Sequence, residues 1–479
     1  MSEMPTLSNT KVFANAMGKS AETLLPAVSL TNIRLAAASA LLYAVVLGVI
    51  TSYSAPATAD MKRPGSRFSD VTPDEITWIG SLPNLGCLFG NLIAGYATHE
   101  FGRKTVMMFV SIFYLTSWLM VAYAPSMMWM YCGRLIGGIC AGACCVAVPT
   151  YIIEIAPTKI RGQLASGFQI AYTIGVLYVM GLGIFLRWSW LAISGAVIVA
   201  CASCLMVFMP ESPPWLVRAS RPLEAENGLR FLKGPSTDTQ RELQSIMDNI
   251  AENKEEGIRL EELLLPEIYK PTAIALALMF FQQACGISPL MTYTVEIFHS
   301  AGSSIDPAVA ATIVALVQVI ATVLSGSLMD RSGRRCLFVT SGSIMFISLA
   351  VLGSYSFKLN QYLVSYHFVG YIPLISFATY IIAFSLGNGP IPYVMIPEIV
   401  PIKFRSPVVA AAGVLCSLLA FVFNKIFEDM RQGLGDYGVY WTYSFFSLIS
   451  ALFGFFILPE TKGLTMRQIS KSFSHSEKK

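Results

Sequence analysis

Long apolar runs alternate with short polar segments along most of this chain. Each half contains six such runs, and each run has roughly the 20 residues that an α-helix needs to cross the hydrocarbon core of a bilayer. The first crossing is predicted at Ile33–Tyr53, followed by a polar connector, Ser54–Pro73, in which Asp60 lies in a wet loop. The others are predicted at 75–99, 105–124, 128–155, 163–186, 189–209, 271–298, 307–329, 337–356, 368–395, 407–430 and 439–458. This pattern predicts an all-α integral membrane protein with twelve transmembrane helices.

One long polar stretch, Pro210–Lys270, interrupts the pattern. Its 61 residues hold 20 of the 62 Asp, Glu, Lys and Arg side chains in the 479-residue chain. Leucines and isoleucines recur in it at three- and four-residue spacing, which is typical of amphipathic helices on a surface. We therefore predict five parts: a tail at 1–30, a six-helix bundle at 31–209, a helical connector at 210–269, a second bundle at 270–459 and a tail at 460–479.

Composition supports the membrane assignment and narrows the function. Hydrophobic residues make up 54% and charged residues 13% of the chain, against about 25% charged in an average soluble protein. The net charge of +4 is spread over loops, so we expect no nucleic-acid partner. Without a Gly-Lys-Ser/Thr phosphate loop or a histidine cluster, we expect no nucleotide, no cofactor and no enzymatic activity. Cys201 and Cys204 are interpreted as helix-packing residues, because further metal ligands are missing around them.

The positive charges of the short loops predict an orientation. Loops at 100–104, 156–162, 330–336 and 400–406 carry nine Lys and Arg residues, whereas the loops on the opposite side carry six. By the positive-inside rule the first set is cytoplasmic. Both termini and the connector are then cytoplasmic as well, in a multi-pass protein that we expect in the plasma membrane.

The two halves repeat each other at three places. Gly95–Lys104 after the second crossing corresponds to Gly326–Arg335 after the eighth. Glu154–Arg161 corresponds to Glu398–Arg405, and Pro-Glu-Ser-Pro at 210–213 corresponds to Pro-Glu-Thr-Lys-Gly at 459–463. Internal repeats of this kind predict two pseudo-symmetric bundles around a cavity at the midplane, as in transporters.

These motifs make a specific resemblance. The chain resembles the sugar-porter family of the major facilitator superfamily from the first helix to Gly463, and within it the insect facilitated trehalose-transporter branch. The residues that carry the resemblance are Gly133-Arg134, Pro149-x-Tyr151-x-x-Glu154-x-x-Pro157-x-x-x-Arg161-Gly162, Pro210-Glu-Ser-Pro213, Gln282-Gln283 with Gly286, Gly389-Pro-Ile-Pro392 and Pro459-Glu-Thr-Lys-Gly463.

The resemblance implies a cytoplasmic latch of Arg and Glu pairs between helix ends. Its predicted members are Arg103, Glu154, Arg161, Asp330, Arg334, Glu398 and Arg405. Arg–carboxylate pairs at a partly dry helix interface are strong enough to bias a two-state equilibrium. The alternative is that the positive charges only set topology. Arg134, near the start of the fourth helix, is interpreted as part of a structural pair.

The resemblance also implies a sugar site. The predicted substrate-binding residues are Gln169, Gln282, Gln283, Ser288, Gln318, Phe384, Ser385 and Tyr393. Amides suit a sugar because they donate to and accept from hydroxyl groups, although interhelical hydrogen bonds are the alternative role. Gly286 and Pro289 in the seventh helix, and Gly387 to Pro392 in the tenth, predict hinge-like breaks beside this site.

Several positions depart from the family pattern. Ser385 stands where an acid is common in the glucose facilitators, Tyr393 where Trp is usual, and Cys416-Ser417 where Asn-Trp is usual. Such changes alter which sugar the site accepts. Proton-coupled members carry an acid in the first helix, whereas Ile33–Tyr53 contains no Asp, Glu or His. We therefore expect passive transport, with Lys425 as the one interior ionisable group that could alter this.

Together these observations predict a facilitative uniporter for a sugar or sugar-like polyol, with trehalose and hexoses as the candidate substrates, working by alternating access. Its expected partners are that small molecule and the lipid bilayer. Two alternatives stay open. The chain could be a transport-inactive sugar sensor or interaction protein, or it could transport a small polar solute that is not a sugar.

Overall fold

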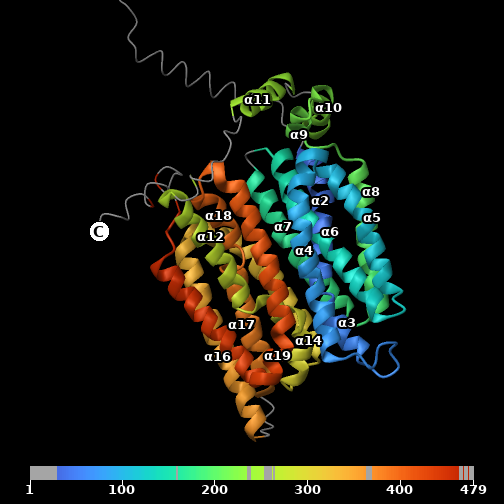
Figure 1. Cartoon of the computed structure of the whole chain (residues 1–479), viewed down its shortest axis with the longest axis vertical. Coiled ribbons are helices and arrows are strands. Elements are labelled where there is room, and N and C mark those ends of the chain that lie inside the picture. Colours follow the sequence, from blue (N-terminus) through green and yellow to red (C-terminus); the bar gives the residue numbers. More distant parts are fainter. Residues whose placement is uncertain are drawn as a thin grey trace, which may run out of the picture.

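The structure is a computed structural model that describes residues 30–157, 160–234, 239–252, 265–362 and 369–462, with the single positions 262, 468 and 473. Residues 1–29 of the predicted tail at 1–30, and most of the predicted tail at 460–479, lie outside the described residues. Figure 1 shows two groups of long helices side by side, the blue-to-green first half on the right and the yellow-to-red second half on the left. The short helices α9 to α11 lie over one end of these groups, which we call the connector end; the opposite end, near α3 and α14, is the far end (Figure 1).

The described helices follow the predicted order. The first half consists of α2 Leu30–Ser52, α3 Ser54–Met61, α4 Pro73–Phe101, α5 Arg103–Ala122, α6 Met127–Ile155, α7 Arg161–Leu182 and α8 Trp188–Val207. The connector contains α9 Pro213–Arg218, α10 Pro222–Lys233 and α11 Thr239–Glu252. The second half consists of α12 Pro266–Ala284, α13 Ile287–Thr292, α14 Thr294–Ser300, α15 Pro307–Ser332, α16 Arg334–Tyr362, the 3₁₀ turn η2 Val369–Tyr371, α17 Ile372–Leu386, α18 Ile391–Ile399 and α19 Ile402–Phe456.

Eleven described segments are long and apolar enough to cross a membrane. One of them, Lys403–Phe456, contains two helices joined at Gly435, whose φ of 73° lies outside the helical region. The described chain therefore provides twelve crossings, which confirms the predicted fold class. The loop predicted between the last two crossings is wrong, because the backbone stays helical on both sides of that one glycine.

Close backbone contacts hold the helices of the first half together. A Cβ on Gly48 of α2 would lie 2.0 Å from the carbonyl oxygen of Tyr172, and a Cβ on Gly175 of α7 would lie 2.0 Å from that of Val45. Only glycine permits this approach, and such small-residue contacts are a common means of packing helices in membranes. Between the halves, α4 packs against α19 and α7 packs against α15.

The seventh and tenth crossings are broken, as predicted. Gly286 ends α12 with a φ of 86°, in the left-handed region that favours glycine, and a Cβ there would lie 2.4 Å from the ring of Tyr443. The tenth crossing is interrupted between Leu386 and Ile391, where Gly387 has non-helical angles. Both breaks leave backbone carbonyl groups available for side-chain donors.

The prediction of a wet loop around Asp60 is wrong. Helix α3 continues the first crossing as far as Met61, and Asp60 is only 9% exposed. Its carboxylate accepts a hydrogen bond from the backbone N–H of Trp188 at 3.0 Å. This partner lies 128 residues away in sequence, so the local run of polar residues around Asp60 could not reveal it.

Arg134 has a structural role, and its hydrogen-bond partners are two backbone carbonyl groups and a serine hydroxyl group. Its side chain is 1% exposed and donates to the carbonyl oxygens of Ile50 at 2.8 Å and Ile79 at 3.1 Å. It also donates to Ser54 Oγ at 2.7 Å and lies 5.3 Å from the centre of the Tyr53 ring. Arg134 thereby ties α2, α3 and α4 to α6, because its five donors satisfy backbone groups on several elements at once.

Candidate functional site

The two predicted glutamines of the seventh crossing lie where both broken helices meet. Gln282 and Gln283, near the end of α12, are 3% and 6% exposed. Gln282 Nε2 donates to the carbonyl oxygen of Gly389 at 2.7 Å and to that of Asn388 at 3.3 Å. One amide therefore connects the break after α12 to the break between α17 and α18, and satisfies carbonyl groups that a continuous helix would have bonded itself.

A thiol joins several predicted residues into one polar cluster. Cys416 Sγ in α19 accepts a hydrogen bond from Gln283 Nε2 at 3.2 Å and contacts Gln282 Oε1 at 3.6 Å. The hydroxyl group of Tyr393 lies 3.7 Å from the same sulfur, and Ser288 Oγ donates to Gln283 Oε1 at 2.9 Å. The structure thus brings four of the predicted substrate residues together around Cys416. The sequence singled out Cys416 only as a departure from the family pattern.

Tyr393 is the exposed member of this cluster. The residue is 54% exposed although its hydroxyl group reaches α19 from α18. Beside the cluster, Asn91 Nδ2 of α4 donates to Ser417 Oγ at 3.1 Å, which brings the first half to the same place. Asn91 was missed in the sequence, although an amide within an apolar crossing is a signal of function or of interhelical bonding.

The other predicted substrate residues are not bonded to this cluster in the described structure. Gln169 is half-buried in α7. Gln318 in α15 is 5% exposed, and among the described residues no group hydrogen-bonds its buried Oε1. Ser385 and Phe384, at 6% and 9% exposure, lie in α17 just before its break. A buried amide oxygen without a partner is unfavourable, so Gln318 is the member of this group with free accepting capacity.

At the connector end, a charge cluster lies within the first half. Arg103 NH2 donates to Glu154 Oε1 at 2.8 Å, and the other oxygen of Glu154 accepts from Ser212. The carboxylate of Glu211 accepts from the backbone N–H groups of Arg103 at 3.0 Å, Lys104 at 2.9 Å and Thr105 at 3.0 Å. Glu211 therefore caps the start of α5, where a negative charge is favourable.

The second half repeats this cluster. Arg334 NH2 donates to Glu398 Oε1 at 3.2 Å, and Thr461 Oγ1 donates to Glu398 Oε2 at 2.6 Å. Glu460 caps the start of α16 by accepting from the backbone N–H groups of Arg334 and Arg335, each at 3.1 Å. Burial alone would raise the pKa of Glu460. The hydrogen bonds that its carboxylate accepts from backbone N–H groups have the larger effect, so the pKa of Glu460 is lowered.

The remaining predicted latch residues have different surroundings. Arg161 NH2 donates to the carbonyl oxygen of Ala156 at 3.3 Å. Arg405 is half-buried near the start of α19. The side chain of Asp330 lies outside the described part of the structure. Both described pairs of the predicted latch, Arg103–Glu154 and Arg334–Glu398, therefore join helix ends of a single half.

At the far end, ion pairs join the two halves. Glu296 Oε1 in α14 accepts a hydrogen bond at 3.0 Å from Nζ of Lys62, which directly follows α3 in the first half. It also accepts one at 3.1 Å from NH1 of Arg431, in the second half. In a second cluster, Lys425 of α19 contacts the carboxylate of Asp74, donates to Thr77 Oγ1 at 2.9 Å and lies 4.4 Å from the centre of the Trp78 ring. Lys425 is thus directed to the far end of α4. The sequence did not predict either cluster.

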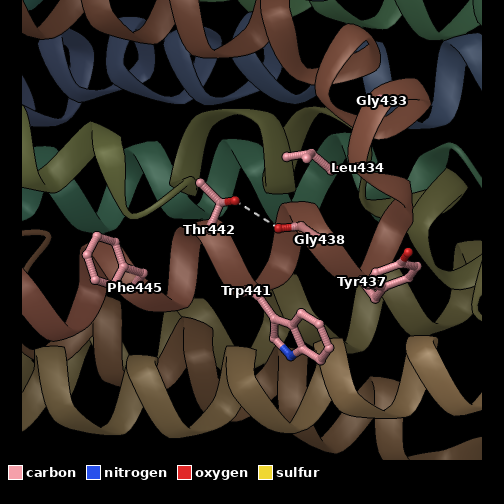
Figure 2. A pocket seen from close by; sticks show the side chains of 7 residues that line it. All are labelled: Gly433, Leu434, Tyr437, Gly438, Trp441, Thr442 and Phe445. Carbon is pink, nitrogen blue, oxygen red and sulfur yellow. Dashed lines mark hydrogen bonds between the residues drawn. The ribbon is translucent and has the colours of Figure 1, made fainter.

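A groove of about 580 Å³ lies on the second part of α19 and is separate from the predicted site. Figure 2 shows its seven lining residues, which are Gly433, Leu434, Tyr437, Gly438, Trp441, Thr442 and Phe445. The hydroxyl group of Thr442 is already bonded to the carbonyl oxygen of Gly438 at 2.8 Å (Figure 2). Phe445 is 58% exposed. We interpret this groove as part of the lipid-facing surface, where exposed aromatic residues are expected.

Twelve crossings in two halves, with broken helices around a polar cluster, define the class of multi-pass membrane transporters. The family model described as "Sugar (and other) transporter" matches residues 33–473. The chain belongs to this family.

Relatives within the family include insect transporters. The chain is 34% identical over 439 residues to the facilitated trehalose transporter Tret1 of Drosophila virilis, covering 91% of this chain and 48% of that protein. It therefore spans about half the length of that relative. It is 33% identical over 440 residues to the facilitated trehalose transporter Tret1-2 homolog of Drosophila simulans, covering 91% of this chain and 90% of that protein.

Solved structures show the same fold. The inward-open conformation of the xylose transporter XylE from E. coli matches 92% of this chain and 99% of its own, with 23% identity and a TM-score of 0.77. This likeness confirms the fold class that the sequence predicted.

Proposed function

We propose that this protein is a facilitative transporter of a sugar or sugar-like polyol that works by alternating access. Trehalose and hexoses are the first substrates to test, since Tret1 proteins are its relatives. The observation that carries the proposal is the buried amide pair, Gln282 and Gln283, at the junction of two broken helices. Amides there can exchange their present hydrogen bonds for those of sugar hydroxyl groups.

The proposed substrate site combines this pair with Ser288 of α13 and Tyr393 of α18. Gln318 of α15 and Gln169 of α7 are proposed to complete it. Tyr393 supplies an accessible aromatic ring for stacking on a sugar face, and Gln318 supplies an acceptor. Cys416 takes part as the contact between the amides and Tyr393. A thiol is a weak hydrogen-bonding group, which favours a substrate with a less polar edge at this point than a plain hexose has.

The proposed cycle moves the two halves against each other around this site. In the conformation described here, ion pairs close the far end by joining the halves. The opposite conformation would break those pairs and bring the connector ends together, where Arg103, Arg161, Arg334 and Arg405 would act with Glu154 and Glu398 as the latch. The positive connector-end loops favour a cytoplasmic connector and termini. The plasma membrane is the proposed location.

Transport is proposed to be passive. The first crossing extends to Met61 and so includes Asp60, but that carboxylate is bonded to Trp188 N–H and Arg63 at the far end. Lys425 is likewise engaged at the far end, by Asp74 and Thr77. Neither group reaches the amide cluster through a described contact.

Uptake by purified protein in proteoliposomes tests the proposal. Radiolabelled trehalose, glucose, a polyol panel and small polar solutes that are not sugars would be compared with empty vesicles. For the accepted sugar, Gln282→Ala and Gln169→Ala should each raise KM tenfold or more, which is about 1.4 kcal/mol. Gln244→Ala, an exposed connector position, serves as the matched control.

Each outcome of this experiment has a meaning. No uptake of any sugar or polyol above empty vesicles would contradict the proposal and favour a sensor or another solute. Loss of folded protein with an unchanged KM would show that the amides are structural. In the same vesicles, an imposed proton gradient should leave the final sugar ratio at equilibrium. Accumulation that an uncoupler abolishes would contradict passive transport.

A further inference from the structure

A polar cavity at the far end of the first half is used by none of the functions above. Its volume is about 500 Å³, and it lies between the loop after α3 and the loop that joins α7 to α8. The residues that concern us are Asp60, Arg63, Ser66, Arg67, Arg187 and Ser189. None of them belongs to the amide cluster or to the ion pairs that join the halves.

The charge of this cavity is unbalanced. Three arginines line it, against the single carboxylate of Asp60. That carboxylate is already occupied, because it accepts from Trp188 N–H at 3.0 Å and lies 3.4 Å from Arg63 NH1. Arg67 and Arg187 are exposed, and we find no hydrogen bond or ion pair from either guanidinium to any described residue. Two positive charges therefore face the cavity without a counter-charge.

Helix α8 begins at the cavity wall. It starts at Trp188, and Arg187 occupies its N-cap position. The Asp60 carboxylate already accepts from the Trp188 N–H at 3.0 Å and so meets the partial positive charge of this helix start. Ser66 Oγ is buried in the cavity wall and hydrogen-bonds no group in the described part of the chain, which leaves a hydroxyl donor as well.

We propose that this cavity binds a phosphate-type anion. Guanidinium groups match phosphate oxygens in bidentate geometry, and Arg67 and Arg187 supply two of them from the two loops that line the cavity. The anion could be a free phosphate or the headgroup of a phospholipid. Phe185 and Trp190 beside the cavity are 82% and 61% exposed, and exposed aromatic residues of this kind are typical of the depth at which headgroups lie.

Thermal unfolding of the purified full-length protein tests the site. In detergent, inorganic phosphate would be titrated against sodium chloride of equal ionic strength. In parallel, the protein would be measured in vesicles of phosphatidylcholine alone or mixed with phosphatidylglycerol. The Arg67→Gln/Arg187→Gln double variant should weaken the apparent affinity at least about tenfold, because each lost charge-assisted pair removes comparable binding free energy. Arg218→Gln, an exposed arginine at the connector end, should leave it unchanged.

The detergent and vesicle experiments distinguish the two sources of the anion. Stabilisation by inorganic phosphate that the double variant loses supports a free anion. Stabilisation only in vesicles with phosphatidylglycerol supports a lipid headgroup. Full retention of either effect in the double variant overturns the site. If that variant does not fold, the wild-type arms still decide, since no stabilisation by either probe overturns the proposal. The single variants Arg67→Gln and Arg187→Gln would then locate any effect that is seen.

Discussion

The two ends of the molecule use ion pairs in opposite ways. At the connector end, Arg103–Glu154 and Arg334–Glu398 each join helices of one half, and the two clusters repeat each other nearly group for group. At the far end, Lys62–Glu296 and Lys425–Asp74 join one half to the other, and among the ion pairs of the described residues neither has an equivalent in the internal repeat. Repeated contacts therefore stabilise each half as a unit, whereas the unrepeated ones hold a particular conformation.

This difference separates stability from conformational equilibrium. Contacts within a half are kept when the halves move as rigid bodies, so they contribute equally to both states. A contact between the halves exists in one state only, and only such a differential contact can shift the equilibrium. Substitutions at the two ends should therefore change different observables.

The largest effect is expected from the caps at the connector end. Glu211→Gln keeps the shape of the side chain but replaces one accepting oxygen by a donor, which faces backbone N–H groups at 2.9–3.0 Å. The free energy of unfolding should fall by about 1.5–3 kcal/mol, the usual range for hydrogen bonds to a charged group. Chemical unfolding in detergent measures this. Glu224→Gln, whose carboxylate is 53% exposed, should change stability by less than about 0.5 kcal/mol.

An intermediate effect is expected at the far end, on conformation. Glu296→Gln removes the partner of two cations, with a side chain only 23% exposed. The population should shift towards a far-end-open state by about 1–3 kcal/mol, or roughly 5- to 150-fold. Spin-label distances between Asp70→Cys and Asp429→Cys, with the exposed native cysteines replaced by serine, report the shift.

Lys425→Met provides the comparison, and it should shift these distances less because Asp74 is 74% exposed and screened by water. Unchanged distances in Glu296→Gln would contradict the role given to the far-end pairs. So would a change of the same size in Glu211→Gln, since that residue contacts only its own half.

The smallest effect is expected from mild acid. Glu460 and Glu296 both have a pKa lowered below the ordinary 4.5, in each case against burial, by backbone N–H groups for Glu460 and chiefly by Lys62 for Glu296. A group with a lowered folded pKa contributes stability above its unfolded pKa and loses it as pH falls through the folded value. Stability should therefore hold from pH 7 to about 5 and decline below about 4.5. The stability difference between wild type and Glu460→Gln should vanish in that lower range. A difference that stays constant with pH would show that Glu460 does not cause the loss of stability in acid.

The sequence was sufficient to predict the crossings, the broken helices and the repeat. Apolar length and turn-forming Gly and Pro are local properties, so the breaks at Gly286 and near Gly387 were predicted before their partners were known. The resemblance named a set of acids and bases at the connector end, among them Arg103, Glu154, Arg334 and Glu398, but not which of them pair. The sequence did not show that Glu211 and Glu460 cap the starts of α5 and α16. Each cap lies more than 100 residues from its helix start, so it depends on the tertiary fold.

What the sequence could not supply were contacts between distant segments. Asp60 lies among polar residues and was predicted in water, yet it bonds the backbone of Trp188. Arg134 has backbone carbonyl groups rather than acids as partners. The role of Cys416 depends on the positions of α12, α18 and α19 together. Each of these contacts depends on how the helices pack. The apolar periodicity of a helix does not determine its register relative to its neighbours.

A cross-link at the far end tests most directly the claim that sugar passes by alternating opening of the two ends. Lys62 and Glu296, whose charged groups lie 3.0 Å apart, would both be replaced by cysteine. In proteoliposomes the two thiols would be joined by a short bis-methanethiosulfonate reagent, which forms a disulfide with each cysteine, releases sulfinate and is cleaved by a thiol reductant. Cross-linking should reduce uptake of the accepted sugar at least about tenfold, because a locked state cannot complete the cycle. Cleavage of the cross-link should restore uptake, and treatment with the reagent should leave each single-cysteine variant at its own untreated uptake rate. A fully cross-linked protein that takes up sugar at the rate of the protein without the cross-link would contradict transport by alternating opening of the two ends.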